Sequence, residues 1–317
     1  MSALLGIDYG ATHTKMLLVD GAHGDGPVVA RESVRTGKLE ELAESVRTFT
    51  AGRAVARFGI TVAGTLDERS GVVGRSANMP WLDGVSPART LTDLVGIPGV
   101  AVQDGVATAA AEAALGAGRG VEDVFVIALG TGIAGAHIVA GEVRAGAHGG
   151  AGEVGHIVIG GTHRCSCGQI GCLETLIGGA QLGRRWAELS PATGDPAATA
   201  RDVVLAAESG NQGAEDALAQ ASDALARALL QISALLDPGV IVIGGGVARS
   251  PRWTVVPAFE KARRDATFHR LPDMRLAELG VWAGAHGAVL SAAEAPHQGS
   301  PSGLAAATCG SPRPAGG

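Results

Sequence analysis

The sequence predicts an α/β protein with an internal duplication. Helical and strand patterns alternate along the chain, which favours mixed sheets flanked by helices. Residues 4–20 and 124–143 share one layout: an apolar strand, a turn of small and hydroxyl residues, and a second apolar strand. A third apolar strand, residues 239–243, runs directly into Gly244-Gly245-Gly246. A strand that ends in glycines suits nucleotide binding at the carboxyl edge of a sheet, although each of these turns taken alone is an ordinary connection.

The remaining elements are predicted, in chain order, from hydrophobic periodicity and turn residues. Strands are expected at residues 58–63 and 100–102, and helices at residues 39–49, 107–115, 176–189, 216–236 and 282–295. We expect a smaller α/β domain of residues 1–104 plus 283–296 and a larger one of residues 105–282. Residues 297–317 carry Gly, Pro, Ser and Ala without periodicity, so a disordered tail with a free thiol at Cys309 is expected.

The composition narrows the class of protein. The 317 residues are 46% hydrophobic and 18% charged, a globular composition long enough for two domains. Aromatic residues make up 3% and the net charge is −6, so base-stacking platforms and a basic surface for nucleic acid are not expected. The chain opens on a strand pattern, and we expect neither a signal peptide nor a membrane span. Clustered thiols suit a reducing compartment, which predicts a cytoplasmic protein.

Three of the four cysteines, Cys165, Cys167 and Cys172, fall within eight residues, and His156 lies nine residues before the first of them. Three thiolates and one imidazole are the ligands of a closed tetrahedral zinc site. His163 is a rival fourth ligand. Buried thiols or a disulfide are the alternatives, but Cys165 and Cys167 are too close in sequence for an easy bridge. The spacing therefore favours zinc.

Acidic residues stand at positions where they can serve chemistry. Asp104 follows a predicted strand and precedes a predicted helix, so it could be a general base at a cleft or a helix N-cap. Asp8 precedes the first small-residue turn, where it could organise Mg²⁺ or bond its own backbone. Lys15 could reach a phosphate, although no specific contact is expected of a lysine at an exposed strand position. Glu153 and Glu174 bracket the cysteine cluster, so a metal there would fix both carboxylates in one rigid polyol-binding loop.

From Leu4 to about Ala295 the chain resembles the ROK (repressor, open reading frame, kinase) family of sugar kinases, and within it the zinc-containing bacterial glucokinases. The most specific match is Glu153-Val154-Gly155-His156 followed by the segment from Cys165 to Glu174. The resemblance implies that Glu153, His156 and Glu174 contact sugar, and that His156, Cys165, Cys167 and Cys172 hold zinc. It also implies a two-domain actin-like ATPase fold, a duplicated ribonuclease H-like unit, with the active site in the interdomain cleft.

Other matches follow in the same order along the chain. Asp8, Gly10 and Thr12 stand in the first phosphate motif, and Gly130, Thr131 and Gly132 in the second. The resemblance implies that Gly244, Gly245 and Gly246 lie near the nucleotide. It also implies that Asn78 and Gln103 contact sugar and that Asp104 is the base. The resemblance implies an ATP-dependent kinase for the 6-hydroxyl of glucose or a glucose-like sugar. It further implies Mg²⁺, structural Zn²⁺ and a homodimer or homotetramer.

The chain also departs from the family pattern. Gln103 replaces an asparagine that contacts hydroxyls at carbons 3 and 4, and it sets the amide about 1.5 Å further out. Gly105-Val106-Ala107 replaces Ala-Asn-Ala, and His13 replaces a common lysine. An alternative substrate is therefore a modified hexose, such as a kanosamine-type 3-amino-3-deoxyglucose or an N-acetylated amino sugar. One rival class is a sugar-sensing repressor, but the family's repressors carry a DNA-binding domain before the first motif, which here begins at residue 8. The other is a non-catalytic sugar-sensing regulator: Asp8, Asp104 and the three glycine loops argue against it, and the altered region of Gln103 keeps it open.

Overall fold

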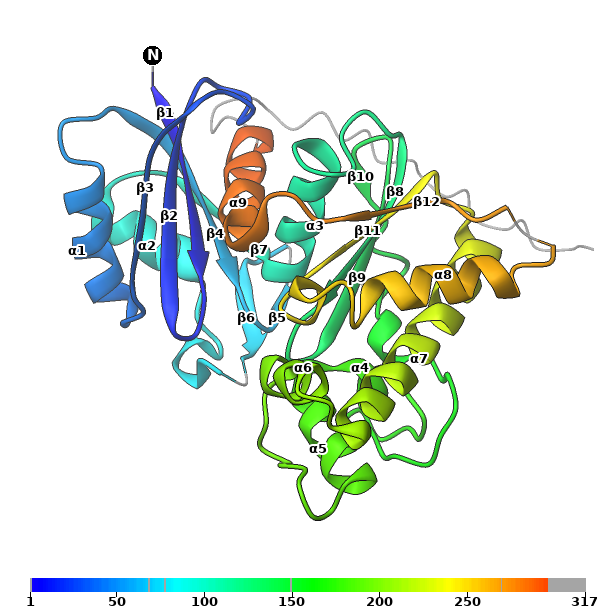
Figure 1. The fold of residues 1–317 in the computed structure, drawn as a ribbon. Coiled ribbons are helices and arrows are strands. Elements are labelled where there is room, and N and C mark those ends of the chain that lie inside the picture. The colour runs from blue at the N-terminus through cyan, green and yellow to red at the C-terminus, as the bar shows by residue number, and fades with distance from the viewer. Residues whose placement is uncertain (1, 68, 77, 149, 269, 296–317) are drawn as a thin grey trace, which may run out of the picture.

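The structure is a computed structural model that describes residues 2–67, 69–76, 78–148, 150–268 and 270–295. The expected tail at 297–317 and Cys309 lie outside the described residues. Two five-stranded sheets stand side by side with helices between and outside them (Figure 1). Within the described part of the chain, no helix is long and apolar enough to cross a membrane.

The first sheet has the order β3-β2-β1-β4-β7. Its strands β1, β2 and β3 are antiparallel neighbours, and β4 and β7 continue the sheet in parallel with β1. The strands are β1 (Ala3–Tyr9), β2 (His13–Asp20), β3 (Val28–Arg35), β4 (Val55–Val62) and β7 (Gly99–Gln103). A separate hairpin joins β5 (Thr65–Asp67) and β6 (Val72–Arg75).

The second sheet repeats this arrangement. Its order is β10-β9-β8-β11-β12, with the same sequence of antiparallel and then parallel neighbours. The strands are β8 (Asp123–Leu129), β9 (Ile133–Val139), β10 (Glu142–Val143), β11 (Val240–Gly244) and β12 (Asp273–Leu276). The predicted duplication is thus present, and it includes all five strands of each sheet as well as the two hairpins from which it was predicted.

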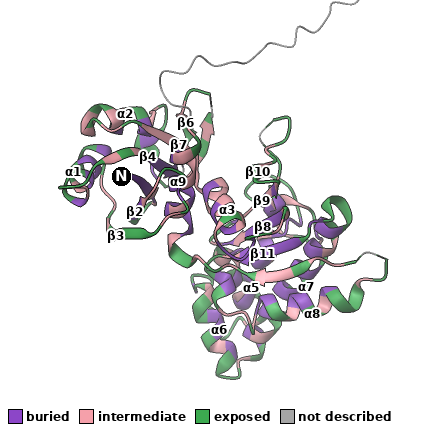
Figure 2. Ribbon diagram, turned by 90° about the horizontal axis from the view of Figure 1, so that it is seen from above, coloured by how far each residue is buried: buried purple, intermediate pink, exposed green. Residues whose placement is uncertain are grey.

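The helices form the outer and middle layers. The outer face of the first sheet packs on α1 (Leu39–Phe49) and α2 (Pro87–Val95). The middle layer consists of α3 (Asp104–Ala114) and α9 (Ala283–Glu294). The helices that cover the second sheet are α4 (Glu174–Ile177), α5 (Gly179–Leu189), α6 (Ala200–Glu208), α7 (Gln212–Leu236) and α8 (Val255–Asp265). Figure 2 shows buried strands in both sheets, each with a core of its own.

Close packing by glycine places α9 in the middle layer. A Cβ on Gly6 of β1 or Gly59 of β4 would clash with carbonyl oxygens of α9, and one on Gly287 would clash with the Ala107 carbonyl of α3. These three glycines let the backbones approach closely. Helix α9 therefore contacts the first sheet on one side and α3 on the other. The expected domain limits at residues 104 and 283 stay a prediction.

The single helix expected at residues 176–189 is wrong. The chain leaves the helix at Gly178, which is extended at φ −56° and ψ 135°. The break turns the Gly179 N–H toward the Gly130 carbonyl, 2.8 Å away, so the turn after β8 is bound to the start of α5. The strands β3, β5, β6 and β12 and the helices α2, α6 and α8 were not expected from the sequence.

Candidate active site

A glycine turn follows each of the strands β1, β8 and β11. The turn after β1 is held by β3, because the Thr36 hydroxyl donates to the Gly10 carbonyl and the Thr36 N–H to the Thr12 carbonyl. The turn after β8 closes through the Gly130 N–H, which donates to the Gly132 carbonyl at 2.9 Å. After β11, Gly245 has a φ of 95° and packs against the Leu129 backbone so tightly that a Cβ would clash.

A cavity of about 890 Å³ opens beside the second and third turns. Its walls come from the second sheet and its helices, with Thr131, Arg184, Thr199, Gly246 and Arg249 among them. This volume lies in the range of ligand-binding clefts. The sequence patterns indicate no residue that would contact the adenine ring of a nucleotide. The wall residues Arg184 and Arg249 carry no motif, and only the fold brings α5, the start of α6 and the loop after β11 together.

Asp8 lies at the end of β1 and does not bond its own backbone through its side chain. One carboxylate oxygen is 2.8 Å from the Lys15 Nζ, and the other accepts from the Thr61 hydroxyl at 3.0 Å. The expectation that Lys15 makes no specific contact is therefore wrong. It is opposite Asp8 in the register of β1 and β2 and forms an ion pair with it.

Asp104 begins α3, immediately after β7. The N-cap is not Asp104 but Gln103, whose side-chain oxygen accepts from the Val106 N–H at 2.8 Å. The Asp104 carboxylate accepts from the Gly105 N–H, also at 2.8 Å. Burial raises the pKa of Asp104; the Gly105 hydrogen bond opposes this, and the Asp8 carboxylate adds to it. Because Gln103 supplies the helix cap, the Asp104 side chain is not used for capping. It remains at the end of β7 as a carboxylate whose pKa is raised.

The longer side chain of Gln103 fits because residue 105 is glycine. A Cβ at Gly105 would lie 3.0 Å from the Gln103 Oε1 and 3.5 Å from its Nε2. The amide therefore folds back over Gly105 to cap the helix and does not extend outward by a methylene. The two departures from the family pattern at positions 103 and 105 compensate each other.

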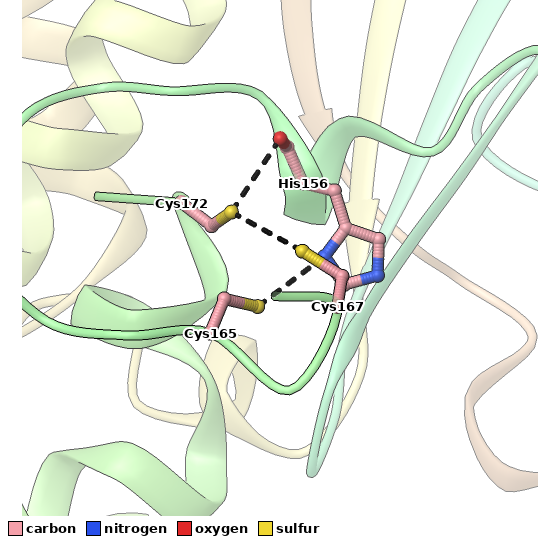
Figure 3. Close-up of side chains that lie close together, drawn as sticks. All are labelled: His156, Cys165, Cys167 and Cys172. Atoms are coloured by element: carbon pink, nitrogen blue, oxygen red, sulfur yellow. Dashed lines mark hydrogen bonds between the residues drawn. The ribbon is translucent and has the colours of Figure 1, made fainter. Parts of the chain in front are cut away.

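The cluster of His156, Cys165, Cys167 and Cys172 has the geometry of a metal site (Figure 3). The four ligand atoms lie within 4.8 Å of one another; Cys167 and Cys172 have their sulfurs 3.7 Å apart, and the Cys165 sulfur is 3.5 Å from the His156 Nδ1. A tetrahedral zinc with ordinary bond lengths requires separations of about 3.8 Å between sulfurs and about 3.5 Å between sulfur and nitrogen. The donor set and its spacing fit zinc. His163 lies elsewhere, against Arg185 of α5.

The two neighbouring thiols differ in proton affinity. A hydrogen bond from the Gln169 N–H lowers the pKa of Cys167 to about 7, whereas burial raises the pKa of Cys172 to about 12. A metal that binds here must displace protons from the sulfurs, so its affinity rises with pH.

Glu174 connects the cysteine segment to the second glycine turn. Its Oε2 accepts from the Ile133 N–H at 3.0 Å, and a Cβ on Gly132 would touch the same oxygen. Glu153 is exposed, three residues before His156. The other ring nitrogen of His156, Nε2, faces away from the sulfurs in Figure 3, which leaves it free for a ligand.

Asn78 is exposed in the loop after β6. The indole N–H of Trp81 in that loop donates to the Tyr9 hydroxyl at 3.4 Å, and this hydroxyl donates to the Gly37 carbonyl at 2.6 Å. The Asn78 loop is thus tied to the end of β1. In the described part of the chain, no hydrogen bond joins the side chains of Asn78 or Glu153 to the other candidate residues.

Comparisons with known proteins match the chain over nearly its whole described length. The ROK family pattern matches residues 4–295. The chain is 30% identical to the glucokinase of Thermotoga maritima over 276 residues, which is 81% of this chain and 86% of that protein. The structure resembles a ROK hexokinase from Thermus thermophilus with a TM-score of 0.82 and 32% identity, over 92% of this chain and 97% of that one. It also resembles a ROK family glucokinase from Streptomyces griseus in complex with glucose and AMPPNP, with a TM-score of 0.74 and 27% identity, over 92% and 99% of the two chains.

Proposed function

The chain belongs to the ROK family and is a hexose kinase with an actin-like ATPase fold, and from this premise we propose that it transfers the γ-phosphoryl group of ATP to the 6-hydroxyl of glucose or a glucose-like sugar. The observation that carries the proposal is Asp104. It starts a helix whose cap is supplied by Gln103, and its raised pKa suits a group that must accept a proton.

Asp104 is the general base in this proposal. Its carboxylate accepts the proton of the sugar 6-hydroxyl as that oxygen attacks the γ-phosphorus, and the bond to the ADP oxygen breaks on the opposite side. Proton transfer of this kind contributes about 10²–10⁴ to the rate. Phosphoryl transfer otherwise depends on positioning and on neutralisation of charge, which backbone N–H groups supply.

The glycine turns hold the phosphates, and the 890 Å³ cavity holds the nucleoside. In this proposal the backbone N–H groups of Thr12, Thr131 and Gly132 bind the phosphates. The small residues Gly10 and Gly130, whose own N–H groups bond within their turns, let the chain approach the anion closely. When bound, Mg²⁺ neutralises charge on the transferred phosphoryl group, and Asp8 is the carboxylate placed to orient its waters. The glycines Gly244 to Gly246 border the nucleoside.

The sugar site lies on the cysteine segment and the loop of Asn78. Glu153, the His156 Nε2 and Glu174 supply the polar groups that bind hydroxyls. Zinc held by His156 and the three cysteines would fix the imidazole tautomer and the loop conformation. Since Glu174 also accepts from the Ile133 N–H, sugar contacts and the second phosphate turn are parts of one hydrogen-bonded unit.

A second candidate substrate is a modified hexose, such as a 3-amino-3-deoxyglucose or an N-acetylated amino sugar. The supporting observation is the folded-back amide of Gln103, whose oxygen accepts a hydrogen bond from the Val106 N–H. A contact that the family pattern directs to carbons 3 and 4 is then absent or replaced by the amide nitrogen alone. The resemblance also supports a homodimer or homotetramer.

The test is a coupled ADP-release assay with Mg-ATP on glucose, mannose, fructose, N-acetylglucosamine and 3-amino-3-deoxyglucose, with Asp104→Asn as the control. Turnover on glucose that disappears in the variant supports the proposal. Clear preference for an amino sugar favours the second candidate. Binding of a sugar without turnover on any of the five, in protein that contains zinc, favours a non-catalytic sugar-sensing regulator.

A further inference from the structure

Lys15 occupies an unusual position for a strand lysine. It lies opposite Asp8 in the antiparallel register of β1 and β2, and its Nζ is 2.8 Å from the Asp8 Oδ2. The two side chains are 23% and 18% exposed, respectively, so most of the pair is shielded from water. An exposed lysine would extend into solvent and gain little from an ion pair. Here the ammonium is held at the end of the first phosphate motif.

The same side chain lines a cavity of about 480 Å³ between the two sheets. Lys15 reaches it from the first sheet, whereas Gly245, Gly246 and Arg249 reach it from the loop after β11. Gly246 and Arg249 also line the 890 Å³ cavity assigned to the nucleoside. The two cavities therefore adjoin, and Lys15 lines the smaller one from the first sheet.

The hydrogen bonds of Lys15 leave capacity for a second partner. An ammonium has three N–H donors, and within the described residues one hydrogen bond is formed, to Asp8. Thr61 already donates to the other Asp8 oxygen, so Asp8 does not depend on Lys15 alone for its position. Donors that face a shielded cavity next to a nucleotide site suit phosphate oxygens, because lysine binds phosphate as a compact point charge.

We propose that Lys15 is a phosphate-binding residue of the nucleotide site, with its ammonium shared between Asp8 and the terminal phosphates of ATP. This inference rests on the proposed function. It gives the chain a cation two residues beyond His13, on the same side of the strand. Lys15 thereby joins the phosphate motif of the first sheet to the nucleoside cavity of the second.

The test measures binding of ATP, AMP and adenosine by calorimetry in wild type, Lys15→Gln and Lys15→Arg. Glutamine retains a hydrogen bond to Asp8 and loses the charge, so a purely structural role is preserved. We expect ATP affinity to fall about ten- to hundredfold in Lys15→Gln, with adenosine affinity unchanged, as for loss of a charged hydrogen bond. Lys15→Arg should stay within a few-fold of wild type. Lys261→Gln, a variant of a lysine paired with Asp265 on α8, is the matched surface control.

Equal affinities of wild type and Lys15→Gln for ATP overturn the inference, as does a parallel loss of ATP and adenosine binding. If Lys15→Gln does not fold, as judged by circular dichroism, Lys15→Met is measured in the same way. The proposed function fails separately, if the wild-type protein does not bind ATP or phosphorylates no sugar.

Discussion

Substitution of Glu112 is expected to destabilise the protein in a graded way. This residue on α3 is 1% exposed, yet its carboxylate accepts three backbone N–H groups. The Oε2 accepts from Ala117 at 3.2 Å and Glu278 at 3.1 Å, and the Oε1 accepts from Leu279 at 2.9 Å. Residues 278 and 279 belong to the connection between β12 and α9, the orange segment of Figure 1. One side chain thus binds the helix of Asp104 to the segment that positions α9.

The loss in free energy of unfolding follows from the number of backbone N–H donors that each variant leaves without an acceptor. Glu112→Gln can keep its oxygen at the Oε2 position, so one donor, the Leu279 N–H, then faces the amide NH₂; this costs about 1–3 kcal/mol. Glu112→Ala removes all three bonds. Because water can enter the space and such losses do not add, we expect about 3–5 kcal/mol. A total stability of about 5–15 kcal/mol makes both variants measurable.

Urea unfolding followed by circular dichroism gives these free energies, with Glu208→Gln on exposed α6 as the control. The control should stay within about 0.5 kcal/mol of wild type. The reasoning is refuted if Glu112→Ala is no less stable than Glu112→Gln, or if both match the control. A variant that remains folded should also show a lower kcat, because α3 carries Asp104 at its start.

Four further predictions concern the site. Because burial raises the pKa of Asp104, kcat/KM should rise with pH to a midpoint above that of an ordinary aspartate; a midpoint at the ordinary value contradicts this. Asp104→Asn should also raise the melting temperature at neutral pH, since a raised carboxyl pKa means that ionisation opposes folding. Cys167→Ser should lose bound zinc and raise the KM for sugar more than the KM for ATP, as checked by metal analysis and kinetics. Gly105→Ala should displace the Gln103 amide and alter the ratio of kcat/KM between glucose and 3-amino-3-deoxyglucose; an unchanged ratio contradicts a role for this pair in specificity.

The sequence predicted the duplicated sheets and the cysteine cluster because both depend on local patterns. Alternating apolar runs around small-residue turns are visible in one dimension, and so is the spacing of three thiols and a histidine. The identity of the helix cap at position 103 was not predictable, because the glutamine amide folds back over residue 105, where a Cβ would lie only 3.0 Å from the Gln103 Oε1. This contact is three-dimensional, although the neighbouring glycine was a signal that could have been used.

The partners of Lys15 and the nucleoside cavity were also missed. An exposed strand lysine and a half-buried one look alike in sequence, and the register that sets Lys15 against Asp8 depends on the turn between β1 and β2. The cavity walls come from α5, the start of α6 and the loop after β11, which are distant in sequence. No periodicity or spacing relates Arg184 to Arg249. The break of the helix at Gly178 depends likewise on a tertiary hydrogen bond to Gly130.

The packing of α9 determines when the first sheet can complete its folding during synthesis. Leu4, Leu17 and Val19 of the first sheet are buried against Ala285 and Val289 of a helix that is synthesised more than 260 residues later. Until that helix emerges, one face of the earliest strands has no partner from its own chain. Contacts of such long sequence separation close slowly. The nascent chain therefore exposes an apolar face of this sheet while the second half of the chain is synthesised. During this interval the exposed face is a binding site for a chaperone.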